Sequence, residues 1–284
     1  MPEPLSGVFH LHPPAMVYRL AQSRLATPYP QRTPLLPDPI RRVVIAKPAK
    51  LYAEAIAEVC QRVFGGAEMH TYCRGLDLLA GLRQAPADLL LIGLAFPDVD
   101  GLDLLEPIAR EKLAAHVLVD SPRHDEYSLL VLRTARFDGF IDAASEGVEA
   151  METALRAVAV GQGYISPALR QGLVDRQPAL ALGRKLTTAE IHVLSVIGDG
   201  SDNDEGAGRL GLSPSTVQTH RRNIMRKLGV STSAKLVREA VRLGVVRITP
   251  SGVVLRSNLH LGAGGYRNGE PLAGEKPWVR SVPT

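Results

Sequence analysis

The chain has 284 residues, of which 45% are hydrophobic and 22% charged, which is typical of a globular protein with about two domains. The net charge of +4 identifies no partner, because many proteins with a similar charge bind no nucleic acid. No apolar run reaches the roughly 18 residues that span a bilayer, and no signal-peptide pattern is present, so we expect a cytoplasmic protein without membrane contact.

The first 39 residues are rich in proline and have no hydrophobic periodicity. We expect an extension that is partly disordered or wraps the surface. Its His10 and His12 have no acidic or cysteine partner nearby, and Cys60 and Cys73 lack the spacing of metal ligands. We therefore expect reduced, inert cysteines, no metal and no cofactor.

Residues 40–160 alternate between short apolar runs and amphipathic helical patterns. Strand-like runs occur at residues 43–46, 69–73, 89–92, 117–119 and 140–141, and a helical pattern follows each of them. This alternation indicates right-handed crossovers and a parallel sheet covered on both faces. The pattern predicts an α/β domain with a doubly wound, flavodoxin-like, five-stranded parallel sheet. A less regular stretch, residues 161–185, is predicted to be a linker.

Helical periodicity returns in residues 186–246, which we expect to form an all-α helix-turn-helix domain. Ser213 is a good N-cap, Pro214 suits the first helical position, and Gly229 lies where a C-terminal cap is expected. One stripe of this helix is apolar: Val217, Ile224 and Leu228. The other side is polar: Gln218, Thr219, Arg222 and Arg226. A helix that enters the major groove of DNA needs this division.

A basic cluster on a helix, here Arg221, Arg222, Arg226 and Lys227, can also be an ordinary solvated face. The wider sequence favours DNA binding. Three motifs, LTTAE, TVQTH and IMRKLGV, match the positions of L-T-x-R-E, T-V-K-x-H and I-x-x-K-L-x-V. Over about 60 residues the segment resembles the DNA-binding domain of LuxR/NarL/FixJ response regulators.

The resemblance implies base-edge contacts from Gln218, Thr219 and Arg222, and phosphate contacts from Lys227, with Thr216 as a further candidate. Arg221 and Arg226 complete the expected DNA-binding set. Residues 233–243 resemble the dimerisation helix of the family, which implies a homodimer on an inverted repeat of double-stranded DNA. The chain departs from the family at residues 203–207, where N-D-E-G-A replaces N-K-E-I-A.

Gly206 and Gly208 lower helix propensity, and Asp204 brings a negative charge. These departures predict weaker packing and weaker DNA affinity than is usual in the family. On this hypothesis, Gly206→Ile should raise the melting temperature or tighten DNA binding.

Residues 41–145 resemble a receiver domain, whose phosphorylation requires an aspartate nucleophile, an acidic pair for Mg²⁺, a Ser/Thr and a lysine. Aligned by motif, Lys47 and Pro48 replace the acidic pair, Gly93 replaces the phosphoacceptor and Ala143 replaces the lysine. Ser121 alone matches its family position. We therefore expect no conventional phosphorylation of this degenerate receiver site.

Two interpretations of the altered site remain open. The site is either vestigial, in a domain that serves for dimerisation or docking, or a switch that responds to a small ligand or a protein. In the second case Lys47 could pair with Asp120 or Asp142, so that its cation replaces the missing metal.

The leading hypothesis is a sequence-specific, DNA-binding transcriptional regulator that acts without receiver phosphorylation. The alternative is a protein-interaction or dimerisation scaffold with weak or no specific DNA binding. We do not expect an enzyme, because the sequence shows no nucleophile–base pair, phosphate loop or metal cluster. Residues 247–284 are predicted to be a loose tail with one hairpin near its start.

Overall fold

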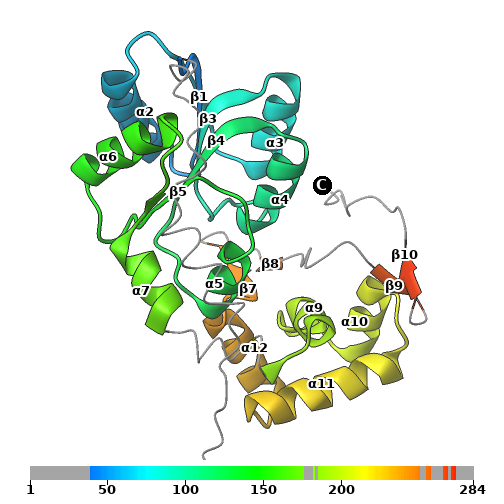
Figure 1. The fold of residues 1–284 in the computed structure, drawn as a ribbon. Helices are drawn as coiled ribbons and strands as arrows, with labels where there is room; N and C mark the ends of the chain where they lie inside the picture. Colours follow the sequence, from blue (N-terminus) through cyan, green and yellow to red (C-terminus); the bar gives the residue numbers. More distant parts are fainter. Residues whose placement is uncertain are drawn as a thin grey trace, which may run out of the picture. The chain divides into compact units, whose positions relative to one another are not determined.

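The computed structural model describes residues 39–175, 182, 185–249, 254–256, 265–267 and 270–272 (Figure 1). The predicted proline-rich extension lies outside these residues, apart from Pro39, and so does most of the predicted tail. Within the described part of the chain, no helix is both long enough and apolar enough to cross a membrane.

Six parallel strands form the sheet of the first domain, in the order β2-β1-β3-β4-β5-β6. Their bounds are β1 (Arg42–Ala46), β2 (Glu68–Tyr72), β3 (Ala87–Ile92), β4 (Ala114–Asp120), β5 (Gly139–Ile141) and β6 (Tyr164–Ile165). The central strands are apolar on both faces, since every residue of β3 except Asp88 is buried. A strand of this kind needs helices on both sides, as the sequence predicted.

Five helices cover the two faces of this sheet: α2 (Lys50–Val63), α3 (Gly75–Gln84), α4 (Leu102–Arg110), α5 (Glu126–Leu132) and α6 (Val148–Ala159). Alternate residues of the strands pack on opposite faces. Val43 and Ile45 contribute to the apolar cluster under α2 and α6, whereas Val44 and Ala46 join the cluster under α3, α4 and α5. The doubly wound α/β fold predicted from the sequence is confirmed.

The sixth strand is a difference from the predicted five-stranded sheet. β6 pairs with β5 in parallel through Gly139–Tyr164 and Phe140–Ile165. It lies with α7 (Pro167–Asp175) in the segment that was predicted to be a linker. Two residues are too short for a period to be visible in the sequence, and β6 is stabilised by its neighbour rather than by a pattern of its own.

Four helices form the second domain: α9 (Thr188–Ile197), α10 (Asn203–Leu210), α11 (Pro214–Leu228) and α12 (Ser233–Arg242). Each begins at a side-chain cap. Thr187 and Glu190 form a reciprocal capping box on α9, and Asp202, Ser213 and Thr232 cap the other three. These caps bind amide groups that have no partner within the helix, and so they fix where each helix starts.

Short antiparallel pairs follow the helices. β7 (Val246–Ile248) pairs with β8 (Val254–Arg256), which agrees with the hairpin predicted there. A second pair, β9 (Gly265–Arg267) with β10 (Glu270–Leu272), lies in the predicted loose tail.

Candidate nucleic-acid interface and receiver site

Helix α11 has the two faces expected from its sequence. Val217 and Ile224 are fully buried and fix the helix against its neighbours. Gly211 and Gly229 end α10 and α11 with φ values of 66° and 70°, a left-handed conformation that glycine adopts without strain. The turn between α10 and α11 therefore has the backbone needed for a helix-turn-helix.

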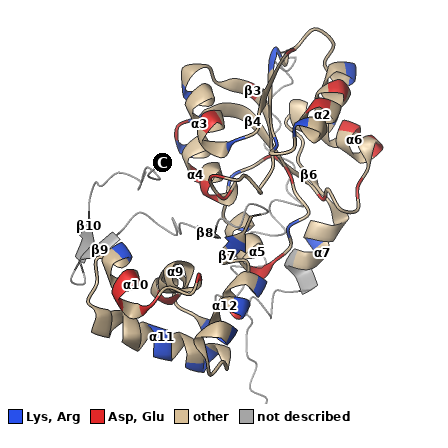
Figure 2. Cartoon of the chain, turned by 180° about the vertical axis from the view of Figure 1, so that it is seen from behind, with Lys and Arg blue, Asp and Glu red and all other residues tan. Residues whose placement is uncertain are grey.

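The polar side of α11 is open to solvent. We call four of its exposed residues the reading surface: Gln218, Thr219, Arg222 and Arg226. Figure 2 shows basic residues along this helix. Neither the amide of Gln218 nor the guanidinium of Arg222 is held by another side chain in the described residues, so both can hydrogen-bond to a partner. The arrangement suits contact with base edges and phosphates.

Five residues of the expected DNA-binding set have partners inside the domain, among them Thr219 and Arg226 of the reading surface. Arg221 donates from Nε to Asn203 Oδ1 at 2.9 Å and from a terminal nitrogen to the Ser201 carbonyl at 2.6 Å, which ties α11 to the start of α10. The hydroxyl of Thr216 lies 2.8 Å from that of Ser213. A contact of these two side chains with DNA would be additional to those bonds.

Lys227 is half-buried, and its Nζ lies 2.6 Å from Glu190 Oε2. Glu190 is itself buried and closes the capping box of α9, so the pair ties α11 to α9. Burial raises the pKa of Glu190, but hydrogen bonds from Lys227 and Thr187 outweigh it, and the net shift is downward. The ammonium expected at a phosphate is therefore engaged within the domain.

The packing of helix α10 at Gly206 differs from the packing that the sequence predicted. A Cβ on Gly206 would lie 3.0 Å from Ile197 Cγ2 and 3.3 Å from Val217 Cγ1. Any side chain at position 206 would therefore press on these two neighbours, so Gly206 does not leave the open gap that the sequence interpretation expected. Gly208 is exposed, and a Cβ there would meet nothing within 4 Å. The propensity argument therefore applies to Gly208.

A shallow hollow of about 440 Å³ lies beside the reading surface. Its lining comes from α10, α11 and the turn after α11: Asn203, Gln218, Arg221, Arg222, Met225, Arg226 and Val230. The sequence analysis did not select Asn203. The Asn203 side chain is positioned by Arg221, 18 residues further along the chain, and a helical period within α11 carries no signal for such a contact.

The receiver site lies at the carboxyl ends of the parallel strands, where Lys47 follows β1 and Gly93 follows β3. Lys47 is buried, and its Nζ lies 2.7 Å from Asp120 Oδ2 and donates to the Asp120 carbonyl at 2.6 Å. Asp120 ends β4, so the pair joins two strands that are separated by β3 in the sheet. Of the two candidate partners, the structure selects Asp120.

Burial lowers the pKa of Lys47, and the charge of Asp120 opposes that shift. Asp142, the other candidate, accepts hydrogen bonds from the Ala144 amide and the Ser145 hydroxyl and lies 3.7 Å from His124 Nε2. The Asp142 carboxylate therefore has hydrogen-bond and ion-pair partners other than Lys47. The sequence position of Lys47 could not distinguish the two aspartates, because both end strands at the same edge of the sheet.

The remaining residues of the site are only partly brought together. A Cβ on Gly93 would lie 3.1 Å from Lys47 Cδ and 3.5 Å from its Nζ. Ser121 is buried, and its hydroxyl accepts a hydrogen bond from the Arg123 amide at 3.2 Å. Pro48 is exposed, and Ala143 is half-buried.

Tyr52, on α2, is a member of the site that the sequence analysis missed. Lys47 Nζ lies 5.0 Å from the centre of its ring, within the range of a cation–π contact. Burial and the nearby charge of Asp120 raise the pKa of Tyr52 to about 12. The hydroxyl is therefore neutral at physiological pH. Among the described residues, no group of three or more His, Cys, Asp or Glu side chains could hold a metal ion.

Comparison with known proteins agrees with this geometry. Residues 184–240 match the family described as bacterial regulatory proteins, luxR family. The chain is 32% identical over 167 residues to a probable transcriptional regulatory protein, SgaR, of Hyphomicrobium methylovorum, an alignment that covers 58% of the chain and 76% of the relative. It is 34% identical over 167 residues to the transcriptional regulatory protein UhpA of Escherichia coli, covering 58% and 79% of the two chains.

Among solved structures, the RcsB response regulator of Salmonella typhimurium aligns with a TM-score of 0.46 at 19% identity, over 71% of this chain and 98% of that one. The match to the luxR family model contains α9, α10 and α11, and the two relatives are each aligned over more than two thirds of their length. The chain therefore belongs to the LuxR family of bacterial regulatory proteins, as a DNA-binding transcriptional regulator of the response-regulator type.

Proposed function

We propose that this protein regulates transcription by binding specific double-stranded DNA as a homodimer, without phosphorylation of its receiver. The observation that carries the proposal is the contrast between two sets of cations. Those of the reading surface are exposed, whereas Lys47 is buried against Asp120 where the family's acidic pair and metal would be.

On the reading surface, Gln218, Thr219 and Arg222 are proposed to contact base edges. A glutamine amide can pair with adenine through N6 and N7, and an arginine with guanine through O6 and N7. Arg226, one turn further along and exposed, is proposed to bind a phosphate. Arg221 and Lys227 support these contacts by holding α11 against α10 and α9.

In the receiver, Gly93 offers no carboxylate to accept a phosphoryl group, and the ammonium of Lys47 would repel Mg²⁺. The Lys47–Asp120 pair supports a receiver that stays in one state. The Lys47 side chain is 5% exposed and the Asp120 side chain is fully buried, so the pair is shielded from solvent and salt.

A selection of genomic DNA fragments by the purified protein, without phosphodonor, tests the DNA-binding part. We expect enrichment of an inverted repeat whose half-sites lie about one helical turn apart, because a two-fold dimer presents two copies of α11. Absence of enrichment at low salt would contradict the proposal and favour the alternative, a protein-interaction scaffold.

Incubation with a small phosphodonor and Mg²⁺ tests the second part. Mass spectrometry should find no phosphoryl adduct, and the affinity for the selected DNA should not change. A receiver that has an aspartate after its third strand, treated in parallel, provides the positive control. An adduct on the receiver, or a phosphodonor-dependent change in affinity, would contradict phosphorylation-independent action.

A further inference from the structure

The two domains are joined end to end by a backbone hydrogen bond. The Tyr127 amide, in the first turn of α5, donates to the Leu243 carbonyl at the C-terminal end of α12, at 3.0 Å. Amides in the first turn and carbonyls in the last turn have no partner within their own helices. Each helix end therefore satisfies the other, and the bond is specific to the docked arrangement.

Glycine is required at this joint. Gly244 has φ +78°, and a Cβ there would lie 1.9 Å from Asp125 Oδ1. Asp125 is the N-cap of α5 and accepts a hydrogen bond from the Ser128 amide, so it cannot move away without uncapping the helix. Any larger residue at position 244 would separate the two helix ends.

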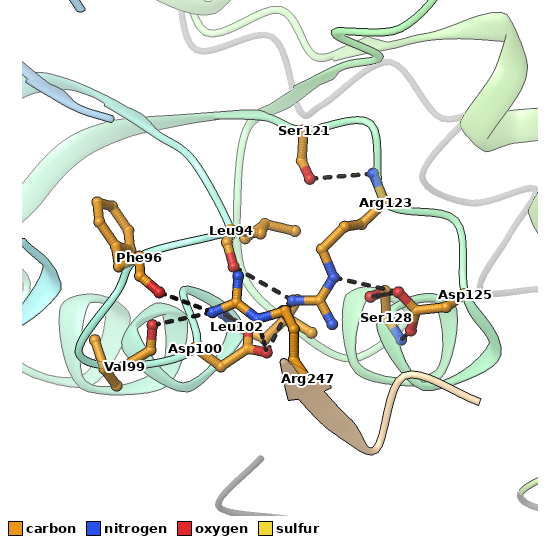
Figure 3. A network of polar contacts seen from close by, with 10 residues as sticks. All are labelled: Leu94, Phe96, Val99, Asp100, Leu102, Ser121, Arg123, Asp125, Ser128 and Arg247. Carbon is orange, nitrogen blue, oxygen red and sulfur yellow. Dashed lines mark hydrogen bonds and ion pairs between the residues drawn. The ribbon is translucent and has the colours of Figure 1, made fainter. Parts of the chain in front are cut away.

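A second contact anchors the strand after α12. Arg247 of β7 donates to the Phe96 carbonyl at 3.0 Å and the Val99 carbonyl at 3.5 Å, and its Nε lies 3.7 Å from Asp100 (Figure 3). Asp100 is buried, and Arg123 also binds both of its carboxylate oxygens at 2.8 Å. The Asp100 carboxylate thus interacts with one arginine from each domain.

Burial lowers the pKa of Arg247, and the charge of Asp100 opposes this shift. For Arg123, burial also acts downward, but Asp100 and Asp125 outweigh it. Apolar packing lies beside these polar contacts. Tyr127 belongs to the same buried cluster as Leu243, Val245 and Val246. Polar and apolar contacts together are what a lasting interface requires, since isolated surface ion pairs contribute little.

The docked arrangement leaves α11 free. The contacts with the receiver come from the end of α12 and from β7, and all four residues of the reading surface remain exposed. Ala234, Arg238 and Val241, which lie along one side of α12, are exposed as well. Both the reading surface and the side of α12 can therefore meet a partner while the domains are joined.

From this geometry we propose that the joint formed by Tyr127, Leu243, Gly244, Arg247 and Asp100 is a permanent dock, which holds the DNA-binding domain on the receiver in a DNA-competent orientation. The dock fixes the angle between the two domains. In a dimer it would therefore set the spacing and orientation of the two α11 helices, a consequence that rests on the proposed function.

Hydrogen exchange of the Tyr127 amide in the full-length protein reports the joint directly. We expect Arg247→Gln and Gly244→Ala each to speed this exchange about ten- to a hundredfold, because they remove a charged hydrogen bond or displace a helix end. Arg123 still pairs with Asp100 in Arg247→Gln, so that variant keeps its buried carboxylate neutralised. Exchange in β4 should be unchanged and shows that the receiver remains folded.

Two matched variants control for side effects. Arg238→Gln removes an exposed arginine of α12, and Gly161→Ala places alanine at φ +73° where a Cβ meets nothing within 4 Å. Neither should change the exchange of Tyr127. If Arg247→Gln and Gly244→Ala behave like these controls, the joint does not persist in solution and the proposal is wrong.

Adding a DNA duplex recovered in the selection tests whether the docked form binds. Tyr127 should stay protected in the complex, and the undocked variants should bind the inverted repeat more weakly. Loss of protection on binding would mean that docking and DNA binding exclude each other, which would overturn the inference. A wild-type protein that binds no DNA but protects Tyr127 would instead contradict only the proposed function.

Discussion

The receiver site and the reading surface use positive charge in opposite ways. At the receiver site, the Lys47 side chain is 5% exposed and its ammonium is held by Asp120. On the reading surface, Arg222 and Arg226 are exposed to solvent. A buried pair has already been removed from water and is available to no partner, whereas an exposed guanidinium can exchange water for a phosphate or a base.

Burial and ion-pair partners distinguish the cations that are held inside a domain from those that are open to a partner, and sequence position alone does not. Lys227 and Arg226 are neighbours in one basic cluster, but Lys227 is bound to Glu190 and belongs with Lys47. Arg226 makes one 3.3 Å contact within its own helix, to Asn223, and belongs with Arg222. The variants below test this division, beginning with the largest expected effect.

Lys47→Met should lower the free energy of unfolding by about 3–5 kcal/mol, because it leaves the Asp120 carboxylate buried without a counter-charge. Lys47→Met combined with Asp120→Leu should recover most of this loss, since the pair is then replaced by apolar side chains. Chemical denaturation measures both. If Lys47→Met alone were as stable as the wild type, the pair would be solvated, and Lys47 would not differ from the exposed arginines of the reading surface.

Glu190→Gln should lower the free energy of unfolding by about 1.5–3 kcal/mol near neutral pH, because a charged hydrogen bond to Lys227 is lost. The folded-state pKa of Glu190 is below its ordinary value of 4.5. Its contribution is therefore complete above pH 4.5 and is lost as the pH falls through the folded-state pKa.

Denaturation curves between pH 7 and pH 3 test this sign. The difference between the wild type and Glu190→Gln should shrink as the solution is acidified. If it instead grows, Glu190 is not stabilised in its charged form, and Lys227 would return to the exposed group of cations.

Arg222→Ala should weaken binding to the selected DNA by about 1–3 kcal/mol and relax preference at one base pair. Arg226→Ala should weaken binding on all sequences and reduce the slope of log affinity against log salt by about one. Arg136→Ala, which removes an exposed arginine of the receiver, is the matched control. Equal effects from all three would mean that the reading surface has no special role.

Gly208→Ala should stabilise the DNA-binding domain by about 0.5–1 kcal/mol, since the added methyl group meets open space in a helix. Gly206→Ile should instead destabilise it, because Ile197 and Val217 already fill that position. Melting temperatures of the two variants separate the stability of the domain from its DNA affinity. A stabilising Gly206→Ile would restore the original interpretation of α10.

Much of this architecture is visible in the sequence, because it depends on local patterns. The apolar runs predict five of the six strands, and Ser213, Pro214 and Gly229 predict the ends of α11. β6 is missed because two residues carry no period. Features that depend on tertiary contact are also missed, such as the closeness of Ile197 to Gly206.

The candidate sites divide in the same way. The helical period places Gln218, Thr219 and Arg222 on an exposed face, as the structure does. It cannot show that Lys227 meets Glu190, 37 residues earlier, or that Arg247 reaches the Phe96 carbonyl, 151 residues earlier. Such partners are set by how the helices and strands pack and not by the residues on either side.

The crowding of Gly93 by Lys47 also bears on how the receiver could change in evolution. A Gly93→Asp mutation would place a new carboxylate beside an ammonium 3.5 Å from its Cβ, so the two would pair instead of leaving a free nucleophile. Mutating Lys47 first would strand Asp120 without a counter-charge. Each of these single steps towards a phosphorylatable receiver is thus unproductive or costly, so the proposed loss of phosphorylation could be reversed only by at least two coupled mutations.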